Sequence, residues 1–523
     1  MSLNRLFGPL LNQPQTPRIS ERSQRLLAVL LSTGFAVILY GWTAAPHVTW
    51  AHEGADGGEL LAAALTNGVP HPPGYPFYMM LLQGWLRFSH FLLPNSEPAG
   101  RGALLSVLCA ALSVGVTVFV AGHLLDKQPR RWLWAAIAGL AWAISPLLWA
   151  QAVITEVYGL HVLLFTLLGW VVLVKQGRFV LLIPIVALGV AHHLTFILLL
   201  PAVLYAVWTQ RGGGGRQFLQ TVGALALGGL LGAAFYIRIP LVAPGSLAPP
   251  PVNWGYADNW AGFWWLVSGA AYRGYLFSAP SSTIFGRVAN WAYTLTSQYT
   301  VVGLGLALLG LNEWDRSQAS LRNFSLLWLV PISIYAIGYY TRDSDIYLLP
   351  VTWLVSLWLA IGLAAAVRWL QTRWPAKPLA ALLTTIVLVS LIGLSIWRLP
   401  MLSLRNDTEA RRFLEHSMAV LKPNSLIICR EDKDTFAFWY GAWATGELLR
   451  SAPGTAIIND SLYQFPWYQR LVAALYPDVV GDSASVQDIL ARNHGVRPIF
   501  FSKDLALVPS DQLQADGPLL RYK

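Results

Sequence analysis

The chain has 523 residues, of which 55% are hydrophobic and only 12% are charged. Soluble domains carry about a quarter of charged residues, so this composition excludes a soluble globular protein and indicates a polytopic membrane protein. The net charge of +10 does not indicate nucleic-acid binding, because the Lys and Arg residues stand at the ends of apolar runs and form no basic face. Two cysteines, Cys109 and Cys429, support neither a disulfide framework nor a thiolate metal site.

Apolar runs of membrane-spanning length recur along the chain, starting with the run from Leu26 to Ala45. Arginines precede this run and no convincing cleavage site follows it, so it predicts a retained first span and not a signal peptide. Each run can cross a hydrocarbon core of about 30 Å. We therefore expect about eleven transmembrane helices, beginning near residues 26, 102, 131, 157, 179, 195, 218, 291, 323, 346 and 379.

The segment from Phe77 to Leu93 is also apolar, but polar and basic side chains interrupt it. Counting it as a span would invert every later loop. If it lies in the membrane interface, the N-terminus and the basic residues that flank the spans fall on one side, which the positive-inside rule identifies as cytoplasmic. Residues 46–101 and 238–290 then form two large outer loops.

This arrangement divides the chain into three expected parts. A cytoplasmic segment covers residues 1–25, a transmembrane part covers 26–398, and the tail 399–523 lies outside the membrane. The tail has a soluble composition, so we expect it to form a small α/β domain. Its strand-like runs are LIIC (426–429), TAII (455–458) and PIFF (498–501), and they stand between helix-like stretches such as DTEARRFLEHSMAVL.

The polar stretch HEGADGGE, residues 52–59, follows the first span directly. Asp56 and Glu59 are three residues apart, so on a helix they share one face. The two carboxylates could act as a base and its partner, or could hold a cation. Acids in the first turn of a helix also complement its dipole, so a purely structural role is an equal alternative.

The segment PHPPGYP, residues 70–76, interrupts any helix because its prolines restrict the backbone and Gly74 permits a turn. It holds His71 rigidly, either for a role in catalysis or as a capping histidine. Tyr75, Tyr78 and Trp85 follow and could pack on lipid or sugar faces, or could anchor an interfacial helix.

Further polar groups are expected on the same outer side. In AQAVITEVYGLH, Glu156 stands at the outer end of a span, close to Tyr158 and His161. A carboxylate at that depth is costly and marks a functional site, unless it makes a structural hydrogen bond to a neighbouring helix. His193, within AHHLT, interrupts another apolar hairpin.

The short outer turn YYTRDSDIYLLP, residues 339–350, combines Arg342 with Asp343 and Asp345. Arg342 could hold a phosphate bidentately, or could pair with its acidic neighbours. The carboxylates on this side would suit Mg²⁺ or Mn²⁺, yet no spacing specifies a metal cage. A divalent cation is therefore compatible with the sequence but not demanded by it.

Taken in order, several of these motifs resemble the multipass O-mannosyltransferase-like family of the GT-C glycosyltransferase superfamily. The motifs are DGGE, PHPPGYP, AQAVITEVYGLH, AHHLT, NWG with the following FWWLVSGAAYRGYLF, and DSDIYLLP. The resemblance covers residues 26 to about 367, and continues more loosely through DTFAFWY (434–440) and PWYQRL (466–471). The ordered set is specific, whereas each motif alone would be weak.

The resemblance implies a mainly α GT-C fold with interfacial helices in the first outer loop. It also implies inverting transfer of a sugar, such as mannose, from a polyprenyl-phosphate donor to a hydroxyl of a protein or glycan acceptor on the outer face. The family's key acid matches Asp56, which we expect to act as the base, supported by Glu59 and Glu156. The residues expected to bind the substrates are His71, Tyr75, Tyr158, His161, His193, Arg342 and Asp345. Of these, His71 and Arg342 would stabilise the leaving phosphate.

Two other functions remain open at this level. A lipid or solute transporter would also place carboxylates and histidines along a membrane path, although it normally has charges near the midplane and an internal repeat. A catalytically inactive relative could bind a partner through the tail. The abundance of Arg and Trp beside few Lys residues favours the plasma (inner) membrane of a bacterium, with the active site on its periplasmic or extracellular side.

Overall fold

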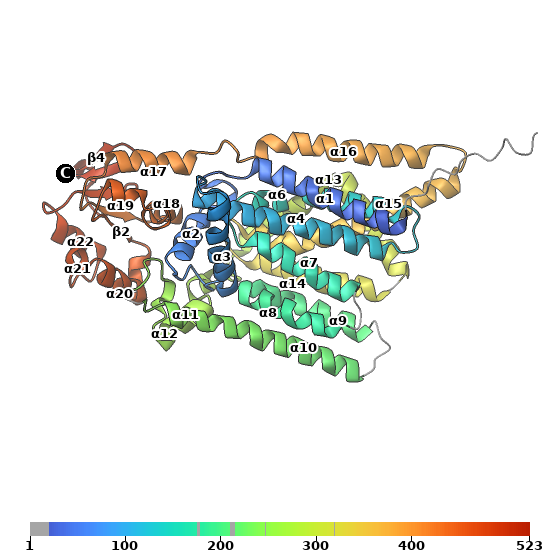
Figure 1. The fold of residues 1–523 in the computed structure, drawn as a ribbon, viewed down its shortest axis with the longest axis horizontal. Helices are drawn as coiled ribbons and strands as arrows, with labels where there is room; N and C mark the ends of the chain where they lie inside the picture. The colour runs from blue at the N-terminus through green and yellow to red at the C-terminus, as the bar shows by residue number, and fades with distance from the viewer. Residues whose placement is uncertain (1–19, 175–177, 210–214, 246, 318) are drawn as a thin grey trace, which may run out of the picture.

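The computed structural model describes residues 20–174, 178–209, 215–245, 247–317 and 319–523. Most of the expected N-terminal segment 1–25 lies outside these residues. Figure 1 shows a bundle of helices along the long axis of the molecule, with the C-terminal part at one end. The bundle helices are α1 (Glu21–Thr43), α4 (Pro98–Leu124), α5 (Arg131–Ala143), α6 (Pro146–Ala152), α7 (Tyr158–Leu173), α8 (Leu182–His192), α9 (Leu200–Thr209), α10 (Gly215–Ala234), α13 (Ser281–Ser317), α14 (Ala319–Gly338), α15 (Leu349–Arg373) and α16 (Leu379–Leu402).

Every expected span falls on one of these helices or on a pair of them. Within the described residues, six helices are long and apolar enough to cross a membrane alone, and the pair α5 and α6, bent by 64°, brings the number to seven. Three shorter apolar segments, Tyr158–Leu173, Phe179–His192 and Leu194–Thr209, lie in the same bundle. An expectation of about eleven spans is roughly consistent with this arrangement.

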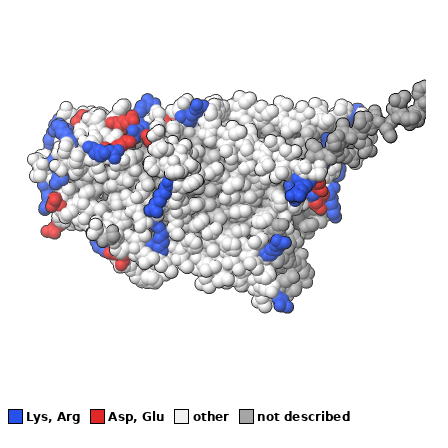
Figure 2. Space-filling model, in the orientation of Figure 1, with Lys and Arg blue, Asp and Glu red and all other residues white. Residues whose placement is uncertain are grey.

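The bundle has the surface of a multi-pass membrane protein. Figure 2 shows charged side chains gathered at the two ends of the molecule, with an almost uncharged face between them. Large apolar side chains are exposed along this part, including Ile386, Val389 and Ile396 of α16. In contrast, α15 is enclosed by its neighbours. Lipid would cover the exposed apolar face, because open apolar surface of this extent is unfavourable in water.

The first outer loop contains two helices, α2 (Asp56–Leu65) and α3 (Pro76–Leu92). Figure 1 shows α3 running across the end of the bundle and not along it, which confirms that this apolar segment is not a span. No helix forms between α2 and α3, where Gly74 has a φ of +86°. Pro76 occupies the first turn of α3, where a missing backbone N–H costs nothing.

The second outer loop consists of short helices: η5 (Phe235–Ile237), α11 (Arg238–Val242), η6 (Trp254–Tyr256), α12 (Trp260–Val267) and η7 (Ala270–Tyr275). Backbone hydrogen bonds join it to the first loop. The Val69 N–H donates to Val252 O at 2.9 Å, and the Trp254 N–H donates to Val69 O at 3.0 Å. These bonds hold the start of the proline-rich segment, residues 70–76, against the second loop.

The C-terminal part contains a five-stranded sheet in the order β2-β1-β3-β5-β4. Strands β1 (Leu426–Cys429), β2 (Ala456–Asn459) and β3 (Ile499–Phe501) are parallel, while β4 (Leu513–Asp516) and β5 (Leu519–Tyr522) form an antiparallel hairpin at the β3 edge. The three predicted strands are confirmed, with β2 one residue later than expected. All three are fully buried, as expected of apolar parallel strands. The helices of this part are α17 (Glu409–Val420), α18 (Asp432–Trp439), the π-helix η9 (Tyr440–Ala444), α19 (Glu447–Ser451), α20 (Pro466–Leu475), α21 (Pro477–Val480) and α22 (Val486–Asn493).

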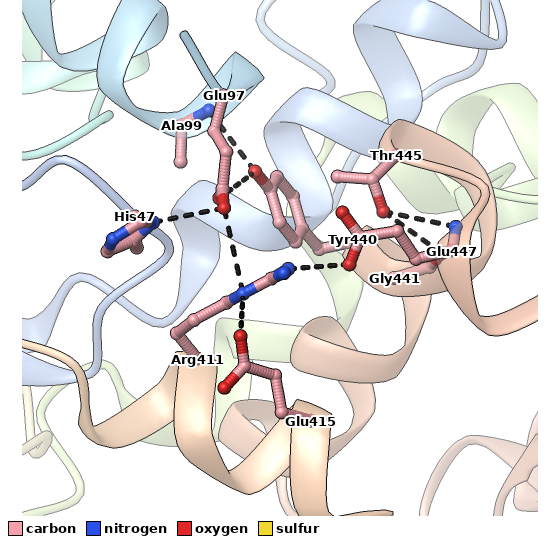
Figure 3. A network of polar contacts seen from close by, with 9 residues as sticks. All are labelled: His47, Glu97, Ala99, Arg411, Glu415, Tyr440, Gly441, Thr445 and Glu447. Atoms are coloured by element: carbon pink, nitrogen blue, oxygen red, sulfur yellow. Dashed lines mark hydrogen bonds and ion pairs between the residues drawn. The ribbon is translucent and has the colours of Figure 1, made fainter. Parts of the chain in front are cut away.

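A polar network fastens the C-terminal part to the first outer loop (Figure 3). Glu97, which precedes α4, accepts a hydrogen bond from the Tyr440 hydroxyl at 3.0 Å and lies 3.0 Å from His47 Nδ1. Arg411 of α17 lies 3.6 Å from Glu97 and donates to Glu447 at 2.6 Å. Because the Arg411 side chain is only 16% exposed, these contacts fix α17 and η9 against the loop.

Candidate active site

A cavity of about 750 Å³ lies at the end of the bundle that meets the C-terminal part. Its walls come from the loops 46–101 and 238–290, the segments around Glu156 and His193, the turn between α14 and α15, and α18 of the C-terminal part. The volume suits a ligand of the size of a phosphorylated sugar. The candidate residues that line it are Asp56, His71, Tyr75, Glu156, Tyr158, His193 and Arg342.

Two glycines bring α2 close to its neighbours and so position Asp56. A Cβ atom at Gly57 would lie 2.9 Å from Thr155 O, and one at Gly58 would lie 2.5 Å from Phe436 O. Helix α2 therefore fits between the turn that carries Glu156 and helix α18 only because its second and third residues have no side chain. Asp56, the first residue of α2, faces the cavity from this junction, with its side chain 39% exposed.

Asp56, His71 and Glu59 form a charged chain. Glu59 is completely buried, and its carboxylate accepts the His71 backbone N–H at 3.0 Å and lies 2.5 Å from His71 Nδ1. The other ring nitrogen, Nε2, lies 3.7 Å from Asp56 and 3.1 Å from the Tyr75 hydroxyl. The two acids thus share the helix face that their spacing predicts, and His71 stands beside both.

This chain sets the charges of its members. Burial lowers the pKa of His71, but Glu59 and Asp56 outweigh it and raise the pKa to about 10, so the ring is a cation at neutral pH. Burial in the cavity raises the pKa of Asp56 to about 6, with His71 opposing the increase and Glu59 adding to it. Asp56 is therefore a carboxylate at neutral pH, but a more basic one than a free aspartate.

Glu156 is a second, less accessible carboxyl group in the cavity wall. It is 4% exposed and accepts the Val157 N–H at 2.7 Å. Burial, followed by the charge of Asp56, raises the pKa of Glu156 well above its ordinary value. Two carboxyl groups whose pKa values differ can take different parts in proton transfer and hydrogen bonding.

Aromatic rings cover another part of the wall. The Tyr158 ring lies 5.7 Å from the His193 ring and 6.3 Å from the Tyr347 ring, measured between centroids. Tyr75, with a φ of 38°, lies in the left-handed region and places its ring 5.8 Å from that of His193. Rings grouped in this way offer flat apolar faces on which a sugar can pack.

Two guanidinium groups line the same cavity. Arg342 is 93% exposed, and its Nε lies 3.8 Å from Glu53. Its partner is therefore not one of the acids next to it in the sequence, Asp343 or Asp345. Arg273, on η7, also lines the cavity, and no carboxylate of the described residues pairs with it. Weakly paired guanidinium groups are suited to binding a phosphate.

Three candidate residues lie outside the cavity lining. Glu59 is behind His71, as described above. His161 is buried on α7, where its ring centroid lies 5.0 Å from that of His193 and its Nδ1 has no hydrogen-bond partner among the described residues. Asp345 lines a separate pocket of about 270 Å³, which it shares with Arg342 and Arg287.

The cavity also contains residues that the sequence did not single out: Glu53, Tyr272, Arg273, Tyr347, Asp432 and Phe436. The sequence contained a signal for Glu53, because this residue lies in the polar HEGADGGE stretch. In the structure, His52 and Glu53 both have a φ of 59°. Strained backbone of this kind gathers at functional sites. No local pattern connects Asp432 to Asp56, since only the tertiary packing of α18 on α2 brings them to one cavity.

No described group of three or more His, Cys, Asp or Glu side chains is arranged to hold a metal ion. Three carboxylates in the cavity have protein partners instead: Asp56 pairs with His71, Glu53 with Arg342, and Glu156 with a backbone N–H.

Comparisons with known proteins find relatives for part of the chain. Residues 56–212 match the family model of the protein O-mannosyl-transferase TMEM260 N-terminal domain. The chain is 24% identical over 318 residues to the protein O-mannosyl-transferase tmem260 of Dictyostelium discoideum. A second relative, the protein O-mannosyl-transferase TMEM260 of Mus musculus, is 31% identical over 115 residues. These matches show that part of the chain is similar to O-mannosyl-transferases of the TMEM260 type.

The match to these relatives is partial. It covers 56% and 22% of this chain, and 37% and 15% of the two relatives, so the chain spans well under half of their length. The family-model match begins at Asp56 and includes His71, Glu156 and His193.

Solved structures show that the fold extends over nearly the whole chain. ArnT from Cupriavidus metallidurans bound to undecaprenyl phosphate matches with a TM-score of 0.57 and 12% identity, covering 96% of this chain and 98% of that one. The apo state of the same protein matches with a TM-score of 0.59 and 13% identity. The C-terminal sheet, which the family model does not cover, is therefore included in the fold shared with ArnT.

Proposed function

We propose that this protein is a membrane glycosyltransferase of the O-mannosyltransferase-like family. It would transfer a sugar, most simply mannose, from a polyprenyl-phosphate donor to a hydroxyl group of a protein acceptor, with inversion. The observation that carries the proposal is the placement of the Asp56 carboxylate in a cavity that also presents the Arg342 and Arg273 guanidinium groups. The relatives named protein O-mannosyl-transferase and the ArnT structure with undecaprenyl phosphate support the substrate classes.

In the proposed reaction, the acceptor oxygen forms a bond to the anomeric carbon while the bond from that carbon to the lipid phosphate breaks. The proton of the acceptor hydroxyl passes to Asp56, and the electron pair of the broken bond leaves with the phosphate. A base whose pKa lies near the working pH is effective in such a transfer, which is typically worth about 10²- to 10⁴-fold in rate. The pKa of about 6 supports this role for Asp56.

The other residues would support this step. His71, held by Glu59, would keep Asp56 ionised. This role fits His71 better than contact with the phosphate, because both of its ring nitrogens already have protein partners. Glu156 would hydrogen-bond a hydroxyl of the sugar or acceptor. Arg342 and Arg273 would hold the leaving phosphate, where a preorganised positive charge stabilises the developing negative charge. Tyr75, Tyr158 and His193 would pack on the sugar.

Transfer of radiolabelled mannose from polyprenyl-phosphate mannose to a serine- and threonine-containing peptide tests the proposal. The wild type and Asp56→Asn are compared in lipid vesicles after both have been shown to melt at the same temperature. We expect turnover by the wild type and a loss of at least 10²-fold in the variant, the lower limit for a positioned base. Equal turnover would remove Asp56 from the role of base, and consumption of no donor by the wild type would overturn the transferase assignment.

A transporter is the second candidate, and the position of the cavity argues against it. The ionisable groups gather at one end of the bundle, whereas a transport site is expected near the midplane between repeats. Uptake of labelled donor into vesicles without any transfer product would favour transport over the enzyme.

We also propose an orientation and a division of the chain. Residues 26–398 would form the catalytic transmembrane part, with residues 1–25 in the cytoplasm and residues 399–523 outside a bacterial plasma membrane. The positive-inside pattern of the sequence supports this orientation. A protease added to intact spheroplasts should cleave the C-terminal part, and protection of that part until the membrane is opened would contradict the orientation.

A further inference from the structure

Asp432 stands where the C-terminal sheet meets the cavity. It begins α18, directly after strand β1, at the carboxyl ends of the parallel strands. In open sheets with parallel strands, this edge is the usual place for ligands. Here Asp432 and Phe436 of α18 also form part of the cavity wall that contains Asp56. The carboxyl ends of the parallel strands, where such sheets usually bind ligands, therefore lie next to the proposed active site.

The Asp432 carboxylate stands among charged side chains. Its neighbour Glu431 lies 3.5 Å from Lys433 Nζ and also pairs with Lys503. The carboxylate of Asp432 itself makes no hydrogen bond or ion pair with the described residues, and its side chain is exposed. An acid in the first helical turn can complement the helix dipole, but Asp434 already lies in that turn. An unpaired carboxylate in a substrate cavity can still accept hydrogen bonds from a bound substrate.

The position of Asp432 relative to Asp56 is fixed by backbone packing. The close approach of Gly58 to Phe436 O joins α2 to α18, and the Trp50 indole N–H donates to Lys433 O at 3.0 Å. The network of Glu97, Arg411 and Tyr440 in Figure 3 holds the same two parts together a short distance away. The backbone that carries Asp432 is thus held in place at the cavity wall, as the support of a residue that recognises a substrate must be.

Resting on the function proposed above, we propose that Asp432 contacts the acceptor and sets its charge preference. The acceptor is a polypeptide segment in which a hydroxyl residue has a hydrogen-bond donor or a cationic side chain next to it. The guanidinium groups of Arg342 and Arg273 would take the donor phosphate, which leaves the wall made by Asp56 and Asp432 for the acceptor. This wall would disfavour an acidic segment, because like charges repel in a partly desolvated cavity.

Two otherwise identical peptides test this preference. Each contains one threonine, flanked by lysines in one peptide and by glutamates in the other, and polyprenyl-phosphate mannose is the donor. The proteins are the full-length wild type, Asp432→Asn, Asp432→Lys and Asp482→Asn, all in vesicles. Asp482→Asn removes the same charge from an exposed turn of the C-terminal part that lies outside the cavity lining.

We expect the wild type to have the lower KM for the lysine-flanked peptide. Asp432→Asn should raise that KM about tenfold, the effect of losing one charge-assisted hydrogen bond, and leave the KM of the donor unchanged. Asp432→Lys should reverse the preference, while Asp482→Asn should behave as the wild type. The reversal is a readout that a merely structural role of Asp432 would not produce.

Other outcomes overturn the inference. Unchanged peptide KM values in both Asp432 variants, or equal use of the two peptides by the wild type, would remove Asp432 from acceptor recognition. Donor consumption by the wild type with transfer to neither peptide would refute a polypeptide acceptor while leaving the glycosyltransferase assignment intact. A wild type that consumes no donor would instead refute the proposed function itself.

Discussion

At the scale of single residues, the chemistry of the site rests on how three neighbouring ionisable groups share charge. A buried Glu59 would be costly alone, and the contact of 2.5 Å with His71 offsets that cost. The same contact and the charge of Asp56 together raise the pKa of His71 to about 10, so His71 is a cation at neutral pH. The motif that looked like two acids on a helix turn is therefore one acid in the cavity wall, one buried counter-ion and the histidine between them.

This charge sharing predicts a pH dependence. If Asp56 is the base, as proposed, transfer requires its ionised form, so kcat/KM should rise with pH through a midpoint near 6 and then level off. His71→Gln removes the positive charge that lowers the pKa of Asp56, and the midpoint should move to higher pH. The measurement is the pH profile of transfer, with His90→Gln on the exposed face of α3 as the matched control. A midpoint that does not move in His71→Gln would refute the coupling.

At the scale of elements, the decisive feature is the contact between α2 and α18. Glycine inside a helix is unfavourable relative to alanine by about 0.5–1 kcal/mol, so consecutive glycines in the first turn of α2 need a compensating reason. The reason is close backbone packing on both sides of the helix. This packing brings a helix from the C-terminal part to a site built mostly by loops and turns at the end of the membrane bundle.

Alanine at Gly58 should separate the two helices. Its Cβ would lie 2.5 Å from a backbone oxygen of Phe436, which cannot move without shifting α18. We expect Gly58→Ala to destabilise the protein by about 1–3 kcal/mol, as overpacking does, and to reduce transfer as well. Gly84→Ala in α3 meets no atom within 4 Å and is the matched control. Thermal melting in detergent distinguishes them, and equal melting temperatures would contradict the proposed contact.

At the scale of the whole molecule, the cavity is a junction between the membrane bundle and a part outside it. Among the contacts that hold the C-terminal part in place, two polar sets lie on different loops. One is the network around Glu97 in Figure 3, and the other is the ion pair of Arg470 with Asp258, 3.0 Å apart, on the second outer loop. Both outer loops are thus fastened to the same C-terminal unit, which covers the cavity from outside.

Removing the Arg411 side-chain charge should loosen this cover. Arg411→Met loses the contacts with Glu97, Glu415 and Glu447, and hydrogen bonds to charged groups contribute about 1.5–3 kcal/mol each where they are shielded. We expect faster hydrogen exchange in α17 and η9 and reduced transfer. Arg412→Met, next along α17 and exposed, bonds only Thr408 among the described residues and should have little effect. Identical exchange in both variants would refute the clamp.

The sequence by itself determined the features that depend on composition and on local pattern. The apolar runs specified the bundle, because a span must satisfy its own backbone hydrogen bonds within a fixed thickness of lipid. The interfacial helix α3, the proline turn and strands β1 to β3 followed from their local patterns in the same way. Most candidate residues, including Asp56, His71 and Glu156, also line one cavity.

Only the tertiary structure decided which of the candidate side chains reach the cavity. Glu59 and His161 looked similar to their neighbours in sequence, yet packing buries both away from the cavity, and it places Asp345 in a separate pocket. The short hairpin of β4 and β5 was missed because most of its residues are exposed or only partly buried, so neither strand has a clear alternation of apolar and polar residues. Asp432 reaches the cavity from more than 370 residues beyond Asp56, because two glycines let α2 meet α18. Such a meeting depends on the complementary shapes of distant surfaces, and no local pattern encodes it.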